Sequence, residues 1–167
     1  DQMRTHGEDI GEILWLMGLR PQWLSEHSDK VIGLEVIPLS ELGRPRLDVV
    51  SRISGLLRDT FPTLITLLDE AVQLVLSLDE PIEANWVKKH YEEEVAELRA
   101  AGIDPETARQ EAKLRVFGCP PGTYGGGVAV LVETKQWQSS DDLGETAITW
   151  GCHAYSQELH GRVSRGA

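Results

Sequence analysis

The spacing of apolar residues predicts a helix followed by short strands in the first part of the chain. A helix over residues 8–18 is indicated by apolar residues at three- and four-residue intervals, namely Ile10, Ile13, Leu14 and Met17. Residues 19–24 and 31–38 are typical of two short strands separated by a polar turn, and they can pair as a hairpin.

The clearest strand pattern covers residues 47–53, and the segment after it is helical but contains Pro62. A proline inside a helix costs about 3 kcal/mol. Burial of the apolar stripe that follows stabilises the helix by about 10 kcal/mol, which exceeds the cost of the proline, so a kinked helix is possible. The alternative is a single turn over residues 56–59 followed by a new helix with Thr60 as its cap and Pro62 in its first turn. We favour this second arrangement because it costs less.

The second half of the chain is predicted to be mainly helical. Apolar spacing and cap residues predict helices over residues 84–101, 105–114, 127–135 and 139–156, and a short strand over residues 115–118. Because strands alternate with helices, we expect an α/β fold with a short central sheet flanked by helices. We expect one segment over residues 1–167, with a strand–helix unit at 1–80 and a mainly helical part at 81–167 that carries a glycine-rich loop at 118–127.

Composition narrows the class of protein. The 41% hydrophobic and 26% charged residues are typical of a soluble globular chain. The net charge of -11 argues against a nucleic-acid or anionic-membrane surface, and no apolar run approaches the roughly 20 residues of a membrane span. Cys119 and Cys152 are far apart, which favours free thiols and a cytoplasmic location. The start at Asp1 and the polar end predict a piece of a longer, multidomain protein.

Charged residues crowd around the strand at 47–53. They are Arg44, Arg46, Arg52 and Arg58 with Asp48 and Asp59. The Ser54-Gly55 turn should present free backbone N–H groups to an anion, and Arg52 and Arg58 can clamp carboxylates. The functional interpretation is therefore a carboxylate-binding edge. An internal ion-pair network that only fixes the loop explains the same residues equally well.

The glycine-rich loop is the second candidate site. Glycines such as Gly122 and Gly125 allow close backbone approach to a ligand, and Tyr124 can stack on a flat ligand or fill the loop. The loop matches neither a Walker A nor a dinucleotide-binding spacing, so ATP binding here is disfavoured. We predict no metal site, because no histidine or cysteine spacing matches a closed zinc site.

Several short motifs resemble the large subunit of the cobaltochelatase and magnesium chelatase family, in order and over nearly the whole chain. The motifs are Glu-Leu-Gly-Arg-Pro-Arg-Leu-Asp-Val-Val at 41–50, Ser-Gly-x-x-Arg-Asp-x-Phe-Pro at 54–62, Leu-Leu-Asp-x-Ala-Val at 67–72, Asp-Glu-Pro at 79–81 with Asn85, and Arg-Val-Phe-Gly at 115–118 with Pro-Gly-x-Tyr-Gly at 121–125. Residues 120–127 look more like the cobalt-type branch of this family.

The resemblance implies ATP-dependent insertion of a divalent metal into a tetrapyrrole, with Co2+ or Mg2+ as substrate and ATP used by separate AAA+ partner subunits. The cobalt-type reading implies Co2+ insertion into a corrinoid precursor of the hydrogenobyrinic acid a,c-diamide type. The alternative is Mg2+ insertion into protoporphyrin IX. A third reading is a non-catalytic scaffold domain that docks the AAA+ subunits through its acidic helix. Partners are then the tetrapyrrole, these subunits and the rest of the large subunit, and the isolated fragment should be inactive.

The resemblance and the residue chemistry together suggest roles for the candidates. For substrate binding we expect Arg44, Arg46, Arg52, Ser54, Gly55, Arg58, Gly122, Tyr124 and Gly125. Metal insertion also needs a base that removes pyrrole protons. Asp48, Asp59 and His6 are the candidates for that base.

Overall fold

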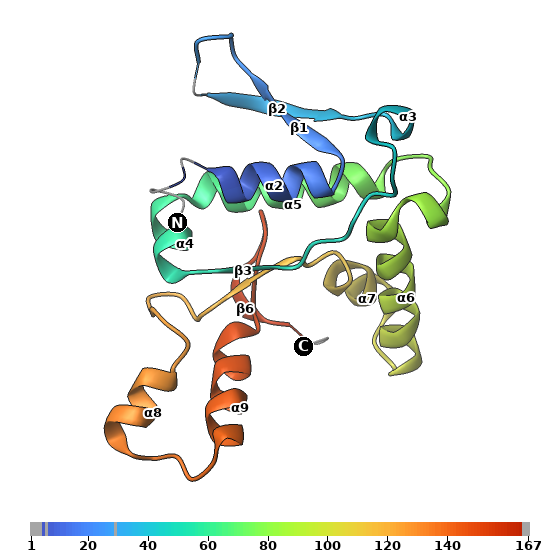
Figure 1. The fold of residues 1–167 in the computed structure, drawn as a ribbon. Helices are drawn as coiled ribbons and strands as arrows, with labels where there is room; N and C mark the ends of the chain where they lie inside the picture. Colours follow the sequence, from blue (N-terminus) through green and yellow to red (C-terminus); the bar gives the residue numbers. More distant parts are fainter. Residues whose placement is uncertain (1–4, 6, 29, 165–167) are drawn as a thin grey trace. The chain divides into compact units, whose positions relative to one another are not determined.

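The computed structural model describes residues 5, 7–28 and 30–164. It is an α/β arrangement of helices and two small sheets (Figure 1), which confirms the expected fold class. The chain forms two compact units, one of residues 1–49 with 70–113 and one of residues 50–69 with 114–167. The expected division at residue 80 stays a prediction.

The first unit combines a hairpin with helices from two separate stretches of chain. Its elements are α2 (Glu8–Leu16), β1 (Leu19–Trp23), β2 (Val31–Val36), α3 (Leu39–Leu42), the 3-10 turn η1 (Ile82–Ala84), α6 (Trp86–Ala100) and α7 (Pro105–Glu111). Leu19 lies opposite Val36 in an antiparallel pair, so the strands do form a hairpin. The unit's core is apolar and includes Leu14, Met17, Leu19, Ile37, Val75 and Val87.

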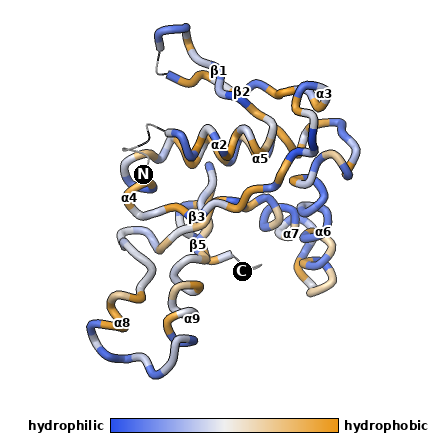
Figure 2. The backbone as a smooth tube through the Cα atoms, viewed as in Figure 1, coloured by the Kyte–Doolittle hydropathy of each residue, from blue (hydrophilic) through white to orange (hydrophobic). Residues whose placement is uncertain are grey.

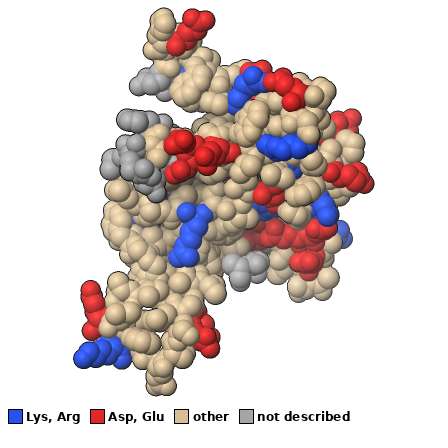
Figure 3. All heavy atoms as spheres, in the orientation of Figure 1, with Lys and Arg blue, Asp and Glu red and all other residues tan. Residues whose placement is uncertain are grey.

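Cap residues explain where the helices of this unit begin. The buried Asn85 side chain accepts a hydrogen bond from the Lys88 N–H at 3.1 Å and so caps α6. Asp104 caps α7 in the same way, and Pro105 occupies its first position. Carboxylates gather over α6 and α7 (Figure 3), which matches the acidic helix that the sequence predicts.

The second unit is built on a four-stranded sheet. Its elements are β3 (Ser51–Ile53), α4 (Gly55–Thr60), the first half of α5 (Pro62–Leu76), β4 (Val116–Gly118), α8 (Val128–Thr134), α9 (Ser140–Gly151), β5 (His153–Tyr155) and β6 (His160–Val163). The strand order is β3-β4-β5-β6; β3 runs parallel to β4, and the other pairs are antiparallel. Only residues 51–53 of the expected strand at 47–53 form β3.

The chain breaks between α4 and α5, as the cheaper of the two predicted arrangements requires. Phe61 has φ -128° and ψ 54°, outside the helical region, and Pro62 begins α5. Thr60, expected to cap the second helix, instead ends α4. The prediction of two helices is confirmed. The assignment of Thr60 as the cap of the second helix is wrong, because Thr60 is the last residue of the first.

The expected helix at 139–156 is wrong at its carboxyl end. α9 stops at Gly151, and residues 153–155 form β5, which pairs with both β4 and β6. Pairing with the distant β4 and with the neighbouring β6 therefore decides the conformation of these residues. Within the residues that the structure describes, no helix is both long and apolar enough to cross a membrane.

Candidate functional site

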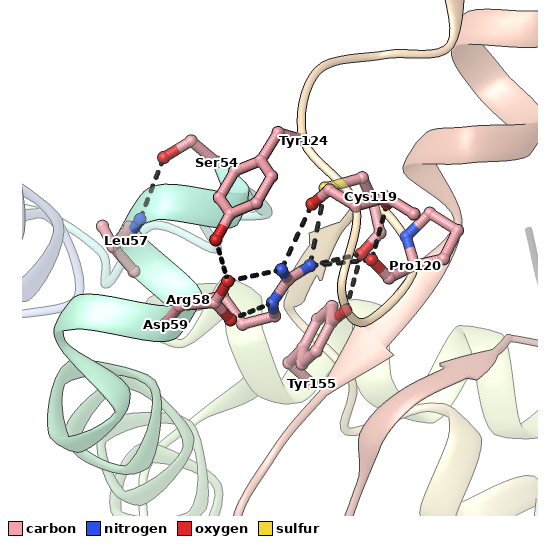
Figure 4. Close-up of polar contacts among 9 residues, drawn as sticks. Ser54, Leu57, Arg58, Asp59, Cys119, Pro120, Tyr124 and Tyr155 are labelled. Carbon is pink, nitrogen blue, oxygen red and sulfur yellow. Dashed lines mark hydrogen bonds and ion pairs between the residues drawn. The ribbon is translucent and has the colours of Figure 1, made fainter.

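The junction between β3 and α4 packs directly against the glycine-rich loop. The Ser54 hydroxyl accepts a hydrogen bond from the Leu57 N–H at 3.1 Å and so caps α4 (Figure 4). A Cβ placed on Gly55 would lie 2.5 Å from the Thr123 carbonyl oxygen and 2.9 Å from Cδ1 of Tyr124. A glycine is therefore required here because the loop backbone occupies the space of a side chain.

The Arg58 guanidinium holds this loop in place. Its side chain is 1% exposed. Its Nη1 donates to the carbonyl oxygens of Cys119 at 3.2 Å and Pro120 at 2.8 Å, and its Nη2 donates to that of Thr123 at 3.2 Å. Its Nε and Nη2 bind the two Asp59 oxygens at 2.6 and 2.8 Å. Arg58 thus joins α4 to three carbonyl groups of the loop backbone.

Tyr124 is exposed but held at both its ring and its hydroxyl. The hydroxyl donates to Asp59 Oδ2 at 2.7 Å, and the ring centroid lies 5.8 Å from the Arg58 guanidinium carbon (Figure 4). The residue is nevertheless 63% exposed. On the buried side, the Tyr155 hydroxyl donates to the Cys119 carbonyl at 2.6 Å. The arrangement presents an oriented aromatic ring to the outside.

Electrostatics keep this cluster in one charge state near neutral pH. The hydrogen-bonded Arg58 guanidinium, and then the Tyr124 hydroxyl, lower the pKa of Asp59 to about 2. The bond to the Asp59 carboxylate raises the pKa of Tyr124, so that phenol stays protonated. A carboxylate with so low a pKa is a weak proton acceptor near neutral pH, which makes Asp59 less suited to act as a base than the sequence indicates.

Acid sensitivity provides a test of this cluster. Because the pKa of Asp59 is lower in the folded chain, its ionised form stabilises the fold above about pH 4, and that contribution is lost as pH falls toward 2. We expect the Tm of Asp59→Asn to fall less than that of the wild type between pH 4 and pH 2. Thermal unfolding at several pH values measures this. Asp141→Asn, at an exposed carboxylate of α9, is the control, and an equal pH slope for Asp59→Asn and wild type would contradict the assignment.

The other arginines also contact their own chain. Arg46 is fully buried against Glu80 and carbonyl groups. Arg44 donates to the carbonyl groups of Trp15 at 2.7 Å and Leu16 at 2.9 Å. For Arg46 and Arg58 the geometry thus matches the internal network and not an exposed clamp on a ligand.

Arg52 differs from Arg58. Among the described residues it has one hydrogen bond, from Nη2 to the Ala147 carbonyl at 3.1 Å. Its Nη2 lies 3.5 Å from the position of a Cβ on Gly126, so it borders the glycine-rich loop. Gly122 and Gly125 in that loop have φ of 75° and 79°, which glycine adopts without strain. A ligand can therefore reach the Arg52 guanidinium, the Tyr124 ring and the backbone of these two glycines.

The candidate bases lie in different settings. Asp48 has a nearly buried side chain, and its Oδ2 lies 3.0 Å from Nδ1 of His90 on α6. Sequence reasoning missed His90, because its partner lies 42 residues away. His6 lies outside the described residues. In the part of the chain that the structure describes, no three histidine, cysteine, aspartate or glutamate residues form a metal-binding group.

Comparisons with known proteins agree with the motifs. A family model described as CobN/Magnesium Chelatase matches residues 1–167. An uncharacterized protein of Methanocaldococcus jannaschii is 52% identical over 95% of this chain, and the aerobic cobaltochelatase subunit CobN of Pseudomonas aeruginosa is 43% identical over 98%. The magnesium-chelatase subunit ChlH of Oryza sativa subsp. indica is 36% identical over 99% of the chain and matches over 11% of its own length.

A solved structure shows the same fold. The catalytic subunit of cobaltochelatase from Mycobacterium tuberculosis matches with a TM-score of 0.83 and 44% identity, over 98% of this chain and 13% of that one. The M. jannaschii and P. aeruginosa proteins are likewise matched over 13% of their length. The chain thus spans about an eighth of the proteins that it matches.

Proposed function

The chain belongs to the CobN/magnesium chelatase family, and on this premise we propose that it forms part of the tetrapyrrole-binding large subunit of a metal chelatase. The reaction is insertion of Co2+ into a corrinoid precursor of the hydrogenobyrinic acid a,c-diamide type. ATP is used by AAA+ partner subunits. The residues of this chain supply contacts to the macrocycle.

The observation that carries this proposal is the exposed Tyr124 ring on its fixed loop. A tetrapyrrole is a flat apolar disc with polar groups at its rim, and aromatic rings stack on such surfaces. Leu56, beside Gly55, adds a second exposed apolar side chain. Arg52 has donors left for a carboxylate or amide rim, in the planar geometry that suits such groups.

We assign the remaining candidates a supporting role. Arg58, Ser54 and Gly55 position the loop and the Tyr124 ring. Arg44 and Arg46 stabilise the first unit through backbone carbonyl groups. Ligand contact is then left to Arg52, Tyr124, Gly122 and Gly125.

Metal insertion replaces inner N–H bonds of the macrocycle with bonds to the metal, so one proton leaves a corrin ring, and two leave a porphyrin, for each divalent ion. A positioned base accelerates such a transfer. Asp48 is the candidate that fits best among the described residues, because it is paired with the exposed imidazole of His90, a side chain that commonly relays protons.

Cobalt is favoured over magnesium by two observations. The loop at 120–127 is similar to the cobalt-type branch, and the cobaltochelatase subunits share more residues with this chain than the magnesium-chelatase subunits do. The alternative is Mg2+ insertion into protoporphyrin IX, which the same fold and family accommodate.

Titration of the full-length protein with each macrocycle tests the proposal. We expect the corrinoid precursor to bind more tightly than protoporphyrin IX. Binding is measured from the absorbance of each macrocycle during the titration. Tyr124→Ala should weaken binding about 3- to 10-fold, because a stacked aromatic contact is worth about 0.5–1.5 kcal/mol. Trp23→Ala, at an exposed aromatic residue of β1, is the matched control.

The possible outcomes separate the readings. Folded full-length protein that binds neither macrocycle would overturn the proposal. Tighter binding of protoporphyrin IX, with Mg2+-dependent insertion, would select the magnesium alternative. Unchanged affinity in Tyr124→Ala would remove the ring from the binding surface while leaving the family assignment in place.

A further inference from the structure

The helical hairpin at residues 127–151 contains a helix, α8, that has the apolar sequence of a buried element but no buried side chain. α8 begins with the consecutive apolar residues Val-Ala-Val-Leu-Val at 128–132. A helix that is apolar on all sides is normally enclosed by protein. In the structure neither α8 nor α9 contains a buried residue.

Large apolar side chains are exposed along both helices and their connection. They are Val130 at 56%, Val132 at 48%, Trp137 at 43% and Ile148 at 69% exposure. Figure 2 shows the hydrophobic residues of α8 along its tube. Scattered exposed apolar residues are ordinary, but a group of this size on one small hairpin marks an interaction surface.

The base of the hairpin is anchored, so its orientation within the second unit is defined. Gly127 has φ of 74°, and a Cβ there would lie 2.6 Å from the Trp150 ring. Arg52 donates to the Ala147 carbonyl of α9 at 3.1 Å. Beyond this base, α8 has 7 residues and α9 has 12. Helices of that length gain most of their stability from packing.

We infer that another part of the same full-length polypeptide covers the α8–α9 hairpin. The matched proteins extend far beyond this region, because the chain corresponds to only 13% of the M. jannaschii and P. aeruginosa relatives. The inference rests on this family membership and is independent of which macrocycle is bound.

The charges of the hairpin indicate the chemistry of the covering surface. Four carboxylates and one lysine surround its apolar residues, namely Glu133, Asp141, Asp142, Glu145 and Lys135. The covering segment should therefore be apolar at its centre with basic residues at its rim.

Hydrogen–deuterium exchange of the full-length protein, without any partner subunit, tests the inference. We expect backbone amides of α8 and α9 to exchange at least about 100-fold more slowly than in the double variant Val130→Lys/Ile148→Lys. Gln138→Lys introduces the same charge at an exposed polar position and should retain the protection. Protected peptides from the second unit's sheet show that each variant is folded.

Two results would overturn the inference. Exchange in the wild type as fast as in the double variant would mean that the hairpin is bare in the whole protein. Protection that appears only at high protein concentration, or only after a partner subunit is added, would assign the surface to a second copy or to that subunit.

Discussion

Replacing Arg46 by methionine is expected to lower the free energy of unfolding by about 3–5 kcal/mol, as is typical when one partner of a buried ion pair is removed. Its Nε and Nη2 each donate to a carboxylate oxygen of Glu80 at 2.8 Å. Its Nη1 and Nη2 also reach the carbonyl oxygens of Gly18 at 2.8 Å and Ile37 at 2.9 Å. Methionine fills much of the space but supplies none of these donors. Urea denaturation of the 167-residue chain measures the loss.

Arg44→Met is the matched control. Arg44 also donates to carbonyl groups, but from a partly exposed position, so we expect a loss of only about 1 kcal/mol. The double variant Arg46→Met/Glu80→Met should recover part of the loss, because both charges are then gone. Equal losses for the Arg46 and Arg44 variants would contradict the buried network.

Gly55→Ala is expected to destabilise the chain by about 1–3 kcal/mol, because an added methyl group collides with a packed backbone. The Thr123 carbonyl oxygen would lie 2.5 Å from the new Cβ, so the loop must move away from α4. Such a shift lengthens the bonds from Arg58 to Pro120 and Thr123. Urea denaturation measures the destabilisation, and the near-ultraviolet circular dichroism of Tyr124 and Tyr155 should change with it.

A second glycine separates this clash from the general effect of alanine. Gly11, in α2, has no atom within 4 Å of an added Cβ. Gly11→Ala should therefore stabilise the chain by about 0.5–1 kcal/mol, since alanine favours helices. If Gly55→Ala were also stabilising, the close approach of the loop would be refuted.

Local signals allowed the helices and the first hairpin to be predicted. Asp104 and Pro105 mark the start of α7, and Pro62 marks the break before α5. The missed strands β5 and β6 have only 3 and 4 residues. Strands so short carry no readable alternation. β5 pairs with β4, more than 30 residues earlier in the chain, and β6 pairs with β5.

The sequence indicated which residues form the site, but not which way their side chains point. Motif reasoning singled out Arg58, Asp59 and Tyr124, which the structure brings together. Whether a guanidinium faces a ligand or its own backbone depends on the loop at 119–123, whose carbonyl groups come from 61 to 65 residues away. No local pattern encodes such a contact, so the sequence left the two interpretations of the arginines equally supported.

The interleaving of the two units has a consequence for synthesis on the ribosome. β3 cannot pair with β4, its parallel neighbour, until residues 116–118 have been translated. During that interval residues 70–113 emerge and can complete the first unit with residues 1–49. A single cut at any unit boundary divides at least one unit, so truncation cannot produce either unit without a piece of the other. The nascent strand at 51–53 is thus unpaired for longer than any other in the sheet, and an unpaired strand edge is prone to aggregation.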